Sequence, residues 1–328
     1  MSGREQETQS LLSAEDQAGS LPAGTRTRWR VAISGARGLI GSYVSRRLGK
    51  LGHQVYRLVR GEPQPRDDEI NWNPQTGMVD WKRLNGFDAV IHLAGEPIGE
   101  GRWSSQKKLE IRQSRVRGTQ LIAEAIKRLD QPPQVLISAS ATGFYGSRGN
   151  AELTEAAEGG SGFLATVCRD WEAAADPARA AGVRVVHPRL GIVLSGEGGA
   201  LARMVPLFRR GLGGVLGRGQ QYLPWIGIDD VVSGLLYMLA KPELIGPVNL
   251  CAPHPVTNAE FTQTLAAVLG KRPGPRVPVW VLKMMLGEMA LETVLASQRA
   301  VPEKLLNAGF GFKYLYLEDA LRSGRRLG

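Results

Sequence analysis

Residues 31–41, VAISGARGLIG, carry three glycines at G-x-x-G-x-x-G spacing, after an apolar run and before a helical pattern. A strand that turns sharply into a helix fits this sequence, because Gly35 suits a tight turn and Gly41 lets the helix pack closely on the strand. Gly38 leaves room for a phosphate near the backbone. Free N–H groups and the helix dipole attract a diphosphate at such a turn. The context predicts a dinucleotide site rather than a plain glycine-rich turn.

Ligands of open α/β sheets bind beyond the carboxyl ends of the strands. The segments expected there are residues 35–41, 60–61, 93–96, 138–145 and 187–191. We predict that the cofactor-binding residues come from these segments. They are Gly35, Ala36, Arg37, Gly38, Leu39, Ile40, Arg60, Leu93, Ala94, Gly95, Ser138 and Pro188.

The end of the second strand indicates which dinucleotide binds, since an acid there binds a ribose 2′-hydroxyl and an arginine accommodates a 2′-phosphate. The strand at 54–59 is followed by Arg60, and the glycine turn contains Arg37. Two guanidinium groups favour NADP(H) over NAD. Glu62 lies close by, and an exposed strand-end arginine is the alternative interpretation of Arg60.

Apolar runs alternate with helical patterns along the first two thirds of the chain, which predicts an α/β fold with a Rossmann-type, doubly wound parallel sheet. Residues 71–81 are interpreted as a turn-rich connection. The helix at 104–129 is expected to be capped by Ser104 or Ser105, and a later helix by Thr257 or Asn258. The remaining expected strands lie at 88–95 and 183–194 and at the start of 134–146, which leads into a polar, glycine-bounded loop. Another helix is expected at 163–181.

The length of 328 residues exceeds one typical domain. We expect a disordered tail at 1–28 and an NADP-binding domain at 29–195, with parts of 220–255 contributing to it. A smaller, mixed substrate lobe is expected at 196–328.

The net charge of +10 comes from local clusters of basic residues. One cluster lies between residues 102 and 117, and the other, between 203 and 218, contains no acid. Only 6% of the residues are aromatic and no nucleic-acid module is visible, so we expect no nucleic-acid partner. A phosphate-bearing small molecule accounts for the clusters, and solvated helix faces are the alternative.

Cysteine content and apolar runs bear on location. Cys168 and Cys251 form no disulfide framework, and neither they nor the four histidines show metal spacing, so no metal is expected. No apolar stretch reaches a membrane-spanning length, and residues 1–28 lack a signal-peptide core. We expect a cytoplasmic protein with a small-molecule substrate and no membrane partner. The sequence carries no signal for an oligomer.

Several longer motifs carry a family resemblance that extends from about residue 30 to 325. They are GARGLIG, HLAGEPI (92–98), SASATGFYG (138–146), FLATVCRDWEAAA (163–175), RLGIVLSGEGGAL (189–201), PWIGIDD (224–230) and PVTNAEFT (255–262). The chain resembles the extended short-chain dehydrogenase/reductase group, in its atypical, epimerase-like branch that includes cell-division-inhibitor-like proteins. The resemblance implies an NADP-binding Rossmann-type domain and a small C-terminal domain from about residue 271.

Extended members of this group use a Ser or Thr and a Tyr-x-x-x-Lys pair, in which the lysine helps the tyrosine exchange a proton. Aligning the helix through Glu172 puts Leu164 and Cys168 at the Tyr and Lys positions, so both groups are missing. The Tyr237–Lys241 pair lies on a different expected helix, and we do not assign it a catalytic role. Cys168 is interpreted as a buried, unactivated thiol rather than a reactive one.

Ser140 matches the family serine, and Tyr145 could supply a phenol or simply pack beside the substrate. These two are the predicted catalytic residues. The predicted substrate-side residues are Glu96, Arg102, Trp103, Arg115 and Trp225, with packing between lobes as the alternative for the two tryptophans. The sequence therefore favours an oxidoreductase or epimerase-like protein that transfers hydride on a small oxygenated substrate. A non-catalytic NADPH-binding sensor is the alternative.

Overall fold

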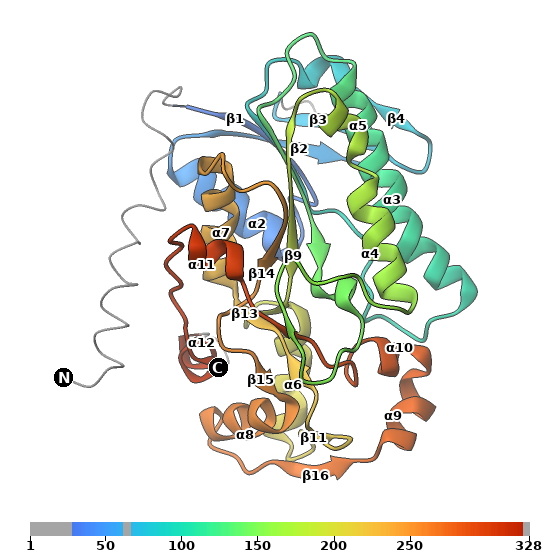
Figure 1. Ribbon diagram of the computed structural model, residues 1–328, viewed down its shortest axis with the longest axis vertical. Helices are drawn as coiled ribbons and strands as arrows, with labels where there is room; N and C mark the ends of the chain where they lie inside the picture. The colour runs from blue at the N-terminus through green and yellow to red at the C-terminus, as the bar shows by residue number, and fades with distance from the viewer. Residues whose placement is uncertain (1–27, 62–66, 324–328) are drawn as a thin grey trace, which may run out of the picture.

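A mostly parallel β-sheet forms the centre of the computed structural model, which describes residues 28–61 and 67–323 (Figure 1). Its strand order is β14-β9-β6-β5-β1-β2-β3-β4, and only the last pair is antiparallel. The strands are β1 (Arg30–Ser34), β2 (Gln54–Val59), β3 (Glu69–Asn73), β4 (Met78–Val79), β5 (Ala89–His92), β6 (Val135–Ser138), β9 (Arg184–Leu190) and β14 (Gly246–Leu250), with β7 (Ser140–Ala141) paired to β9. The predicted α/β fold is confirmed.

Helices cover both faces of the sheet, because successive side chains of a strand point to opposite faces. Val31 and Ile33 of β1 pack in one core with α2 (Leu39–Lys50) and α7 (Ile228–Ala240). Ala32 packs in the opposite core with α3 (Ser105–Lys127) and α5 (Asp176–Ala180). The continuous apolar runs of the sequence are explained by this burial on both sides.

Two predicted elements are interrupted. The helix expected at 163–181 is split into α4 (Phe163–Ala173) and α5, whose second residue, Pro177, has no N–H to continue the α4 ladder. The strand expected at 183–194 breaks at Gly191, where a Cβ atom would lie 2.5 Å from the Pro224 carbonyl oxygen. The chain then enters β10 (Ile192–Leu194), which pairs with β13 (Trp225–Gly227) outside the main sheet.

The interpretation of residues 71–81 as a turn-rich connection was wrong in part, because the segment holds the end of β3 and the whole of β4. Trp72 pairs with Val79 in this hairpin and is buried. The Asn73 carboxamide oxygen accepts from the Gln75 and Thr76 amides and shapes the turn. β3 does alternate polar and apolar residues, but it is only five residues long and β4 is two, so the turn residues between them dominate the pattern. The segment ends in η1 (Trp81–Leu84).

Cap positions agree with the expectations. Ser104 caps α3, with its Oγ accepting from the Lys107 amide at 3.1 Å. Thr257 caps α8 (Asn258–Val268) and forms a reciprocal capping box with Glu260. The end of β6 leads through β7 into η2 (Thr142–Tyr145), so residues 134–146 hold more than one strand.

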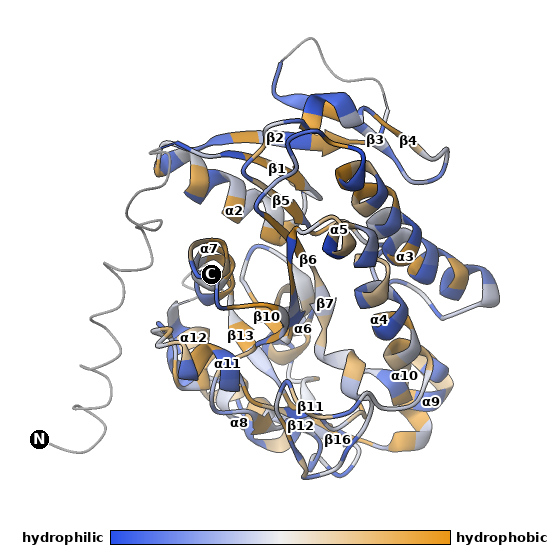
Figure 2. Ribbon diagram, turned by 45° about the horizontal axis from the view of Figure 1, so that its top comes forward, coloured by the Kyte–Doolittle hydropathy of each residue, from blue (hydrophilic) through white to orange (hydrophobic). Residues whose placement is uncertain are grey.

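The last third of the chain builds a second cluster of elements beyond the carboxyl ends of the strands (Figures 1 and 2). Phe208, Phe261 and Leu321 lie in its core. Its elements are α6 (Gly199–Arg209), β11 (Gly214–Leu216), β12 (Tyr222–Leu223), β15 (Val256–Thr257), β16 (Gly274–Val277), α9 (Val279–Leu286), α10 (Glu288–Glu292), β17 (Arg299–Ala300) and α12 (Leu317–Ser323). In contrast, α11 (Glu303–Asn307) packs beside β14, with Leu305 in the core of the main sheet. β17 returns to pair with β8 (Glu152–Leu153).

The tail expected at 1–28 falls, up to residue 27, outside the described residues. None of the helices in residues 28–61 and 67–323 has the length and apolar content that crossing a bilayer requires.

Candidate functional site

The glycine turn between β1 and α2 has the close backbone contacts that its sequence predicts. Gly35 has a φ of +70°, and a Cβ there would lie 2.9 Å from the Ala94 amide nitrogen. A Cβ at Gly41 would lie 2.2 Å from the Gly35 oxygen, so the helix could not pack as it does. Gly38 is the N-cap of α2 and has no side chain to cap it. The first amides of α2 are therefore not capped by a side chain, as a diphosphate site requires.

The ends of β1 and β5 are joined by hydrogen bonds beside this turn. Ser34 Oγ accepts from the Leu93 and Ala94 amides at 3.2 and 3.3 Å. It also lies 2.5 Å from His92 Nδ1. Burial, with a contribution from Arg115, lowers the pKa of His92 to about 3. Because Ser34 Oγ already accepts from two amides, its own proton is the one available for the contact with Nδ1. Leu93 and Ala94 thereby lie next to the glycine turn, as predicted for cofactor-binding residues.

A cluster of arginines and acids lies at the end of β2. Arg37 Nη2 is 3.1 Å from the buried carboxylate of Glu69, and its side chain is 71% exposed. Arg57 Nη2 is 2.6 Å from Asp68, and its Nε is 3.6 Å from the same Glu69 oxygen. Arg60 is exposed directly after the strand. Sequence reasoning missed Arg57 and Glu69, although the alternation along β2 and β3 places them side by side.

Ser140 belongs to a buried network that sequence reasoning also missed. Its Oγ donates to Glu172 Oε1 at 2.7 Å. Arg189 binds the same carboxylate through Nε at 2.8 Å and Nη2 at 2.9 Å. In this bidentate pair with a guanidinium, the Glu172 carboxylate serves as the hydrogen-bond acceptor. The hydroxyl proton of Ser140 is thus directed to Glu172, and its oxygen lone pairs remain to accept from another group.

Tyr145 is fully buried, next to the same network. Its phenol accepts from Arg189 Nη1 at 3.0 Å and donates to Asn249 Oδ1 at 2.7 Å. Burial raises the pKa of Tyr145 to about 12. With both hydrogen-bonding functions occupied and no exposed surface, Tyr145 has the geometry of a packing residue. The structure thus favours the packing alternative over the proton donor that we predicted.

Leu164 and Cys168, at the positions of the missing pair, are buried on α4. Burial raises the pKa of the Cys168 thiol to about 12, which agrees with an unactivated cysteine. The start of α4 is capped from the C-terminal segment, because the Glu292 carboxylate accepts from the Phe163 amide at 3.2 Å and the Leu164 amide at 3.0 Å. The end of α10 therefore fixes the first turn of the helix that bears the altered positions.

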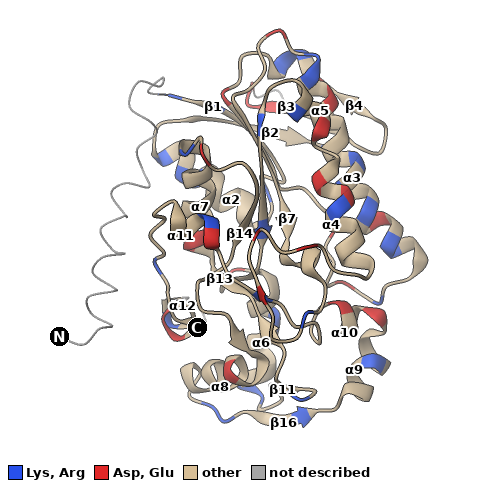
Figure 3. Ribbon diagram, viewed as in Figure 1, with Lys and Arg blue, Asp and Glu red and all other residues tan. Residues whose placement is uncertain are grey.

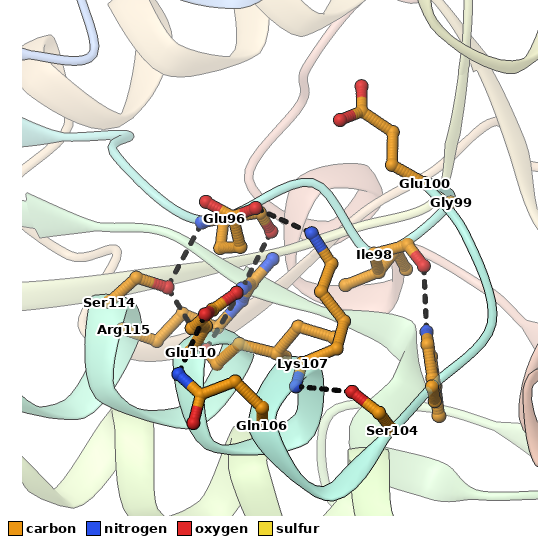
Figure 4. A network of polar contacts seen from close by, with 12 residues as sticks. Glu96, Ile98, Gly99, Glu100, Ser104, Gln106, Lys107, Glu110, Ser114 and Arg115 are labelled. Atoms are coloured by element: carbon orange, nitrogen blue, oxygen red, sulfur yellow. Dashed lines mark hydrogen bonds and ion pairs between the residues drawn. The ribbon is translucent and has the colours of Figure 1, made fainter.

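Glu96 and Arg115, two predicted substrate-side residues, contact each other (Figure 4). Arg115 Nη1 donates to the Glu96 carbonyl at 3.0 Å, and Ser114 Oγ accepts from the Glu96 amide at 3.0 Å. The Glu96 carboxylate pairs with Lys107 at 2.5 Å. These contacts hold the segment after β5 against α3. Arg115 also packs against Gly95, where a Cβ would lie 3.3 Å from the guanidinium carbon.

The other predicted substrate-side residues do not join the contact between Glu96 and Arg115. Trp103 donates from Nε1 to the Ile98 carbonyl at 2.8 Å and packs edge-on against Phe163. Arg102 is exposed near Gly287. Trp225 is fully buried in the second core, so the packing alternative fits it and a substrate wall does not. Ser138 and Pro188 are buried in β6 and β9, beside the ends of their strands.

Comparison with known proteins gives the family. A model of the NAD dependent epimerase/dehydratase family matches residues 31–251, and a model of a domain of unknown function, DUF1731, matches residues 277–323. The chain belongs to the epimerase/dehydratase family. The resemblance found in the sequence motifs is confirmed.

Relatives of this epimerase/dehydratase chain are similar over most of its length. Epimerase family protein Mb2239 of Mycobacterium bovis is 43% identical over 291 residues, covering 89% of this chain and 96% of the relative. The structure of human epimerase family protein SDR39U1, solved with NADPH, is 34% identical with a TM-score of 0.81 and covers 90% of this chain and 98% of that one. A nucleoside-diphosphate sugar epimerase from Corynebacterium glutamicum is 37% identical with a TM-score of 0.77, covering 97% of this chain but 62% of that longer chain.

Proposed function

We propose that this protein is an NADP(H)-dependent oxidoreductase or epimerase-like enzyme that acts by hydride transfer on a small oxygenated substrate in the cytoplasm. The observation that carries the proposal is the α2 N-terminus without a side-chain cap, next to Arg37 and Arg60 at the end of β2. The human relative solved with NADPH supports it. Both cysteines are free and buried, which agrees with a reducing compartment.

The glycine turn, the two arginines and Ser140 have separate roles in this proposal. The amides of the glycine turn hold the diphosphate, and Arg37 and Arg60 hold the 2′-phosphate. The bound nicotinamide supplies the hydride chemistry. Ser140, oriented by Glu172, accepts a hydrogen bond from a hydroxyl of the substrate. To polarise a substrate carbonyl, Ser140 would have to donate its proton to the carbonyl, and its hydrogen bond to Glu172 would have to break.

A non-catalytic NADPH sensor remains the second candidate. Leu164 and Cys168 are buried, and Tyr145 is buried with its phenol bonded to Arg189 and Asn249. These placements favour binding without turnover. The sensor and the enzyme share the cofactor site and differ in chemistry.

The cofactor assignment is tested with Arg37→Ala and Arg60→Ala. Each should weaken NADPH by about 1–3 kcal/mol and leave NADH nearly unchanged, because only NADPH has the 2′-phosphate. Fluorescence titration of both cofactors measures the difference, with Arg322→Ala of α12 as the control that should change neither. Equal losses for NADPH and NADH would contradict a 2′-phosphate site.

Enzyme and sensor are separated by following hydride transfer in both directions. NADPH oxidation is followed with carbonyl compounds, and NADP+ reduction and epimer formation are followed with nucleoside-diphosphate sugars, the substrate class named for the Corynebacterium relative. We expect turnover with one class and its loss in Ser140→Ala, while NADPH affinity stays nearly unchanged. Turnover that persists in Ser140→Ala would show that Ser140 has been misassigned. Binding of the cofactor with no turnover across these compounds would favour the sensor.

A further inference from the structure

Two segments far apart in the sequence contain cations and no acids. Residues 198–228 hold four arginines, and residues 261–287 hold two lysines and two arginines. The structure joins these segments, because β11 pairs with β16 and Gly274 donates to the Gly213 carbonyl at 2.9 Å. We call the joined region, with α9, the β16 end of the molecule; it lies at the bottom of Figure 1. Most of the net charge of +10 is thus concentrated in these two segments.

The cations of the β16 end point to solvent. Figure 3 shows basic residues on β16 and α9 and on the chain after α8. All eight cations of the two segments are exposed, and six of them have no ion pair within the described residues. These six are Arg210, Arg218, Lys271, Arg272, Arg276 and Lys283. This end therefore presents an uncompensated positive surface.

The same end exposes large apolar side chains. On α9, Leu282 is buried and anchors the helix, whereas Trp280, Met284 and Met285 are 67%, 63% and 61% exposed. Leu212, beside β16, is also exposed. Figure 2 shows the apolar colour on α9 at the edge of the molecule. Soluble proteins rarely leave such side chains together in water unless they are covered by a partner.

We propose that the β16 end docks on an anionic lipid surface. Phosphate head groups attract the lysines and arginines, and Trp280 suits the boundary between head groups and acyl chains. Met284 and Met285 are flexible and apolar, so they can enter that boundary without a shaped pocket. A helix with apolar side chains flanked by cations is typical of proteins that lie on a membrane without crossing it. The proposal departs from the expectation of no membrane partner drawn from the sequence, and it is independent of the proposed function.

Other occupants fit less well. A second copy of this chain would bring the same positive charges face to face. Nucleic acid would neutralise the cations but leave the methionines and Leu212 without an apolar contact. An acidic protein would satisfy the cations, and the experiment distinguishes it by the part that the apolar side chains play.

The test is co-sedimentation of the full chain with phosphatidylcholine vesicles, with and without phosphatidylglycerol. We expect binding only to the vesicles that contain phosphatidylglycerol, weakened by about tenfold or more in Lys271→Glu/Arg272→Glu. Trp280→Ser/Met284→Ser should weaken it as well. The matched control is Arg46→Glu/Arg47→Glu on α2, which makes the same charge change away from this end and should bind better than the first variant.

Several results would overturn the proposal. Failure to bind the anionic vesicles is one, and equal weakening by the α2 control is another. Binding that survives Trp280→Ser/Met284→Ser and is displaced by soluble polyglutamate would indicate an acidic protein partner. The substituted side chains are exposed, and an unchanged thermal unfolding midpoint in each variant shows that the fold is intact.

Discussion

At the scale of single residues, the Glu172–Arg189 pair determines what Ser140 can do. The sequence identified Ser140 through its motif, but it did not identify Glu172, which lies 32 residues later. Asp170 and Glu172 stand two positions apart on α4, and Asp170 instead pairs with the exposed Arg112. Either acidic residue fits the helical pattern of the sequence. Only the packing of α4 in the fold decides which carboxylate reaches the serine.

Replacing Arg189 with methionine tests this pair. Arg189→Met leaves the Glu172 carboxylate buried with one partner fewer, so the free energy of unfolding should fall by about 3–5 kcal/mol. Arg112→Met, at the more exposed pair with Asp170, should lower it by less than about 1 kcal/mol. Denaturant unfolding measures both. Similar small losses would contradict a structural role for the buried pair.

At the scale of elements, two strands carry buried neutral histidines. His187 of β9 lies 3.2 Å from the Ser138 carbonyl through Nδ1 and 3.3 Å from Arg179 through Nε2. Its neutral tautomer satisfies both contacts, with Nδ1 donating and Nε2 accepting. Burial lowers the pKa of His187 to about 4, as it lowers that of His92 on β5 to about 3. The sheet therefore excludes a charge on either ring.

Acid should destabilise the sheet through these rings. The unfolded chain takes up protons below its histidine pKa of about 6.5 while the folded chain does not, so stability is full above that pH and falls toward pH 4. Each of the two histidines should lower the free energy of unfolding by about 2 kcal/mol when the pH falls from 6.5 to 5. The free energy of unfolding of His187→Gln, measured at both pH values, should fall by about 2 kcal/mol less than that of the unsubstituted protein. An unchanged difference would contradict a neutral His187 in the folded state.

The sequence predicted the elements whose apolar runs are continuous and missed those that are short or polar. β1, β5 and β6 are buried on both faces and could be recognised. The β3–β4 hairpin was missed because its strands are five and two residues long and are joined by a turn rich in turn-forming residues. The split of α4 from α5 was signalled by Pro177, which the broad helical pattern obscured.

At the scale of the whole molecule, the chain returns repeatedly from its last third to its first. β14 extends the main sheet beside β9, and β17 pairs with β8. Lys108 of α3 pairs with Glu288 of α10. Contacts between positions so far apart leave no local signal in a single sequence, which is why the glycine turn could be predicted and the capping of α4 by the C-terminal segment could not.

The cap that Glu292 places on α4 bears on whether the C-terminal segment could be lost from the chain. The two segments matched by separate family models meet at this carboxylate, so a gene that lost the second would leave the Phe163 and Leu164 amides without their acceptor. Without residues 277–323, these two amides would need another acceptor. The C-terminal segment is thus tied to the helix that carries Leu164 and Cys168.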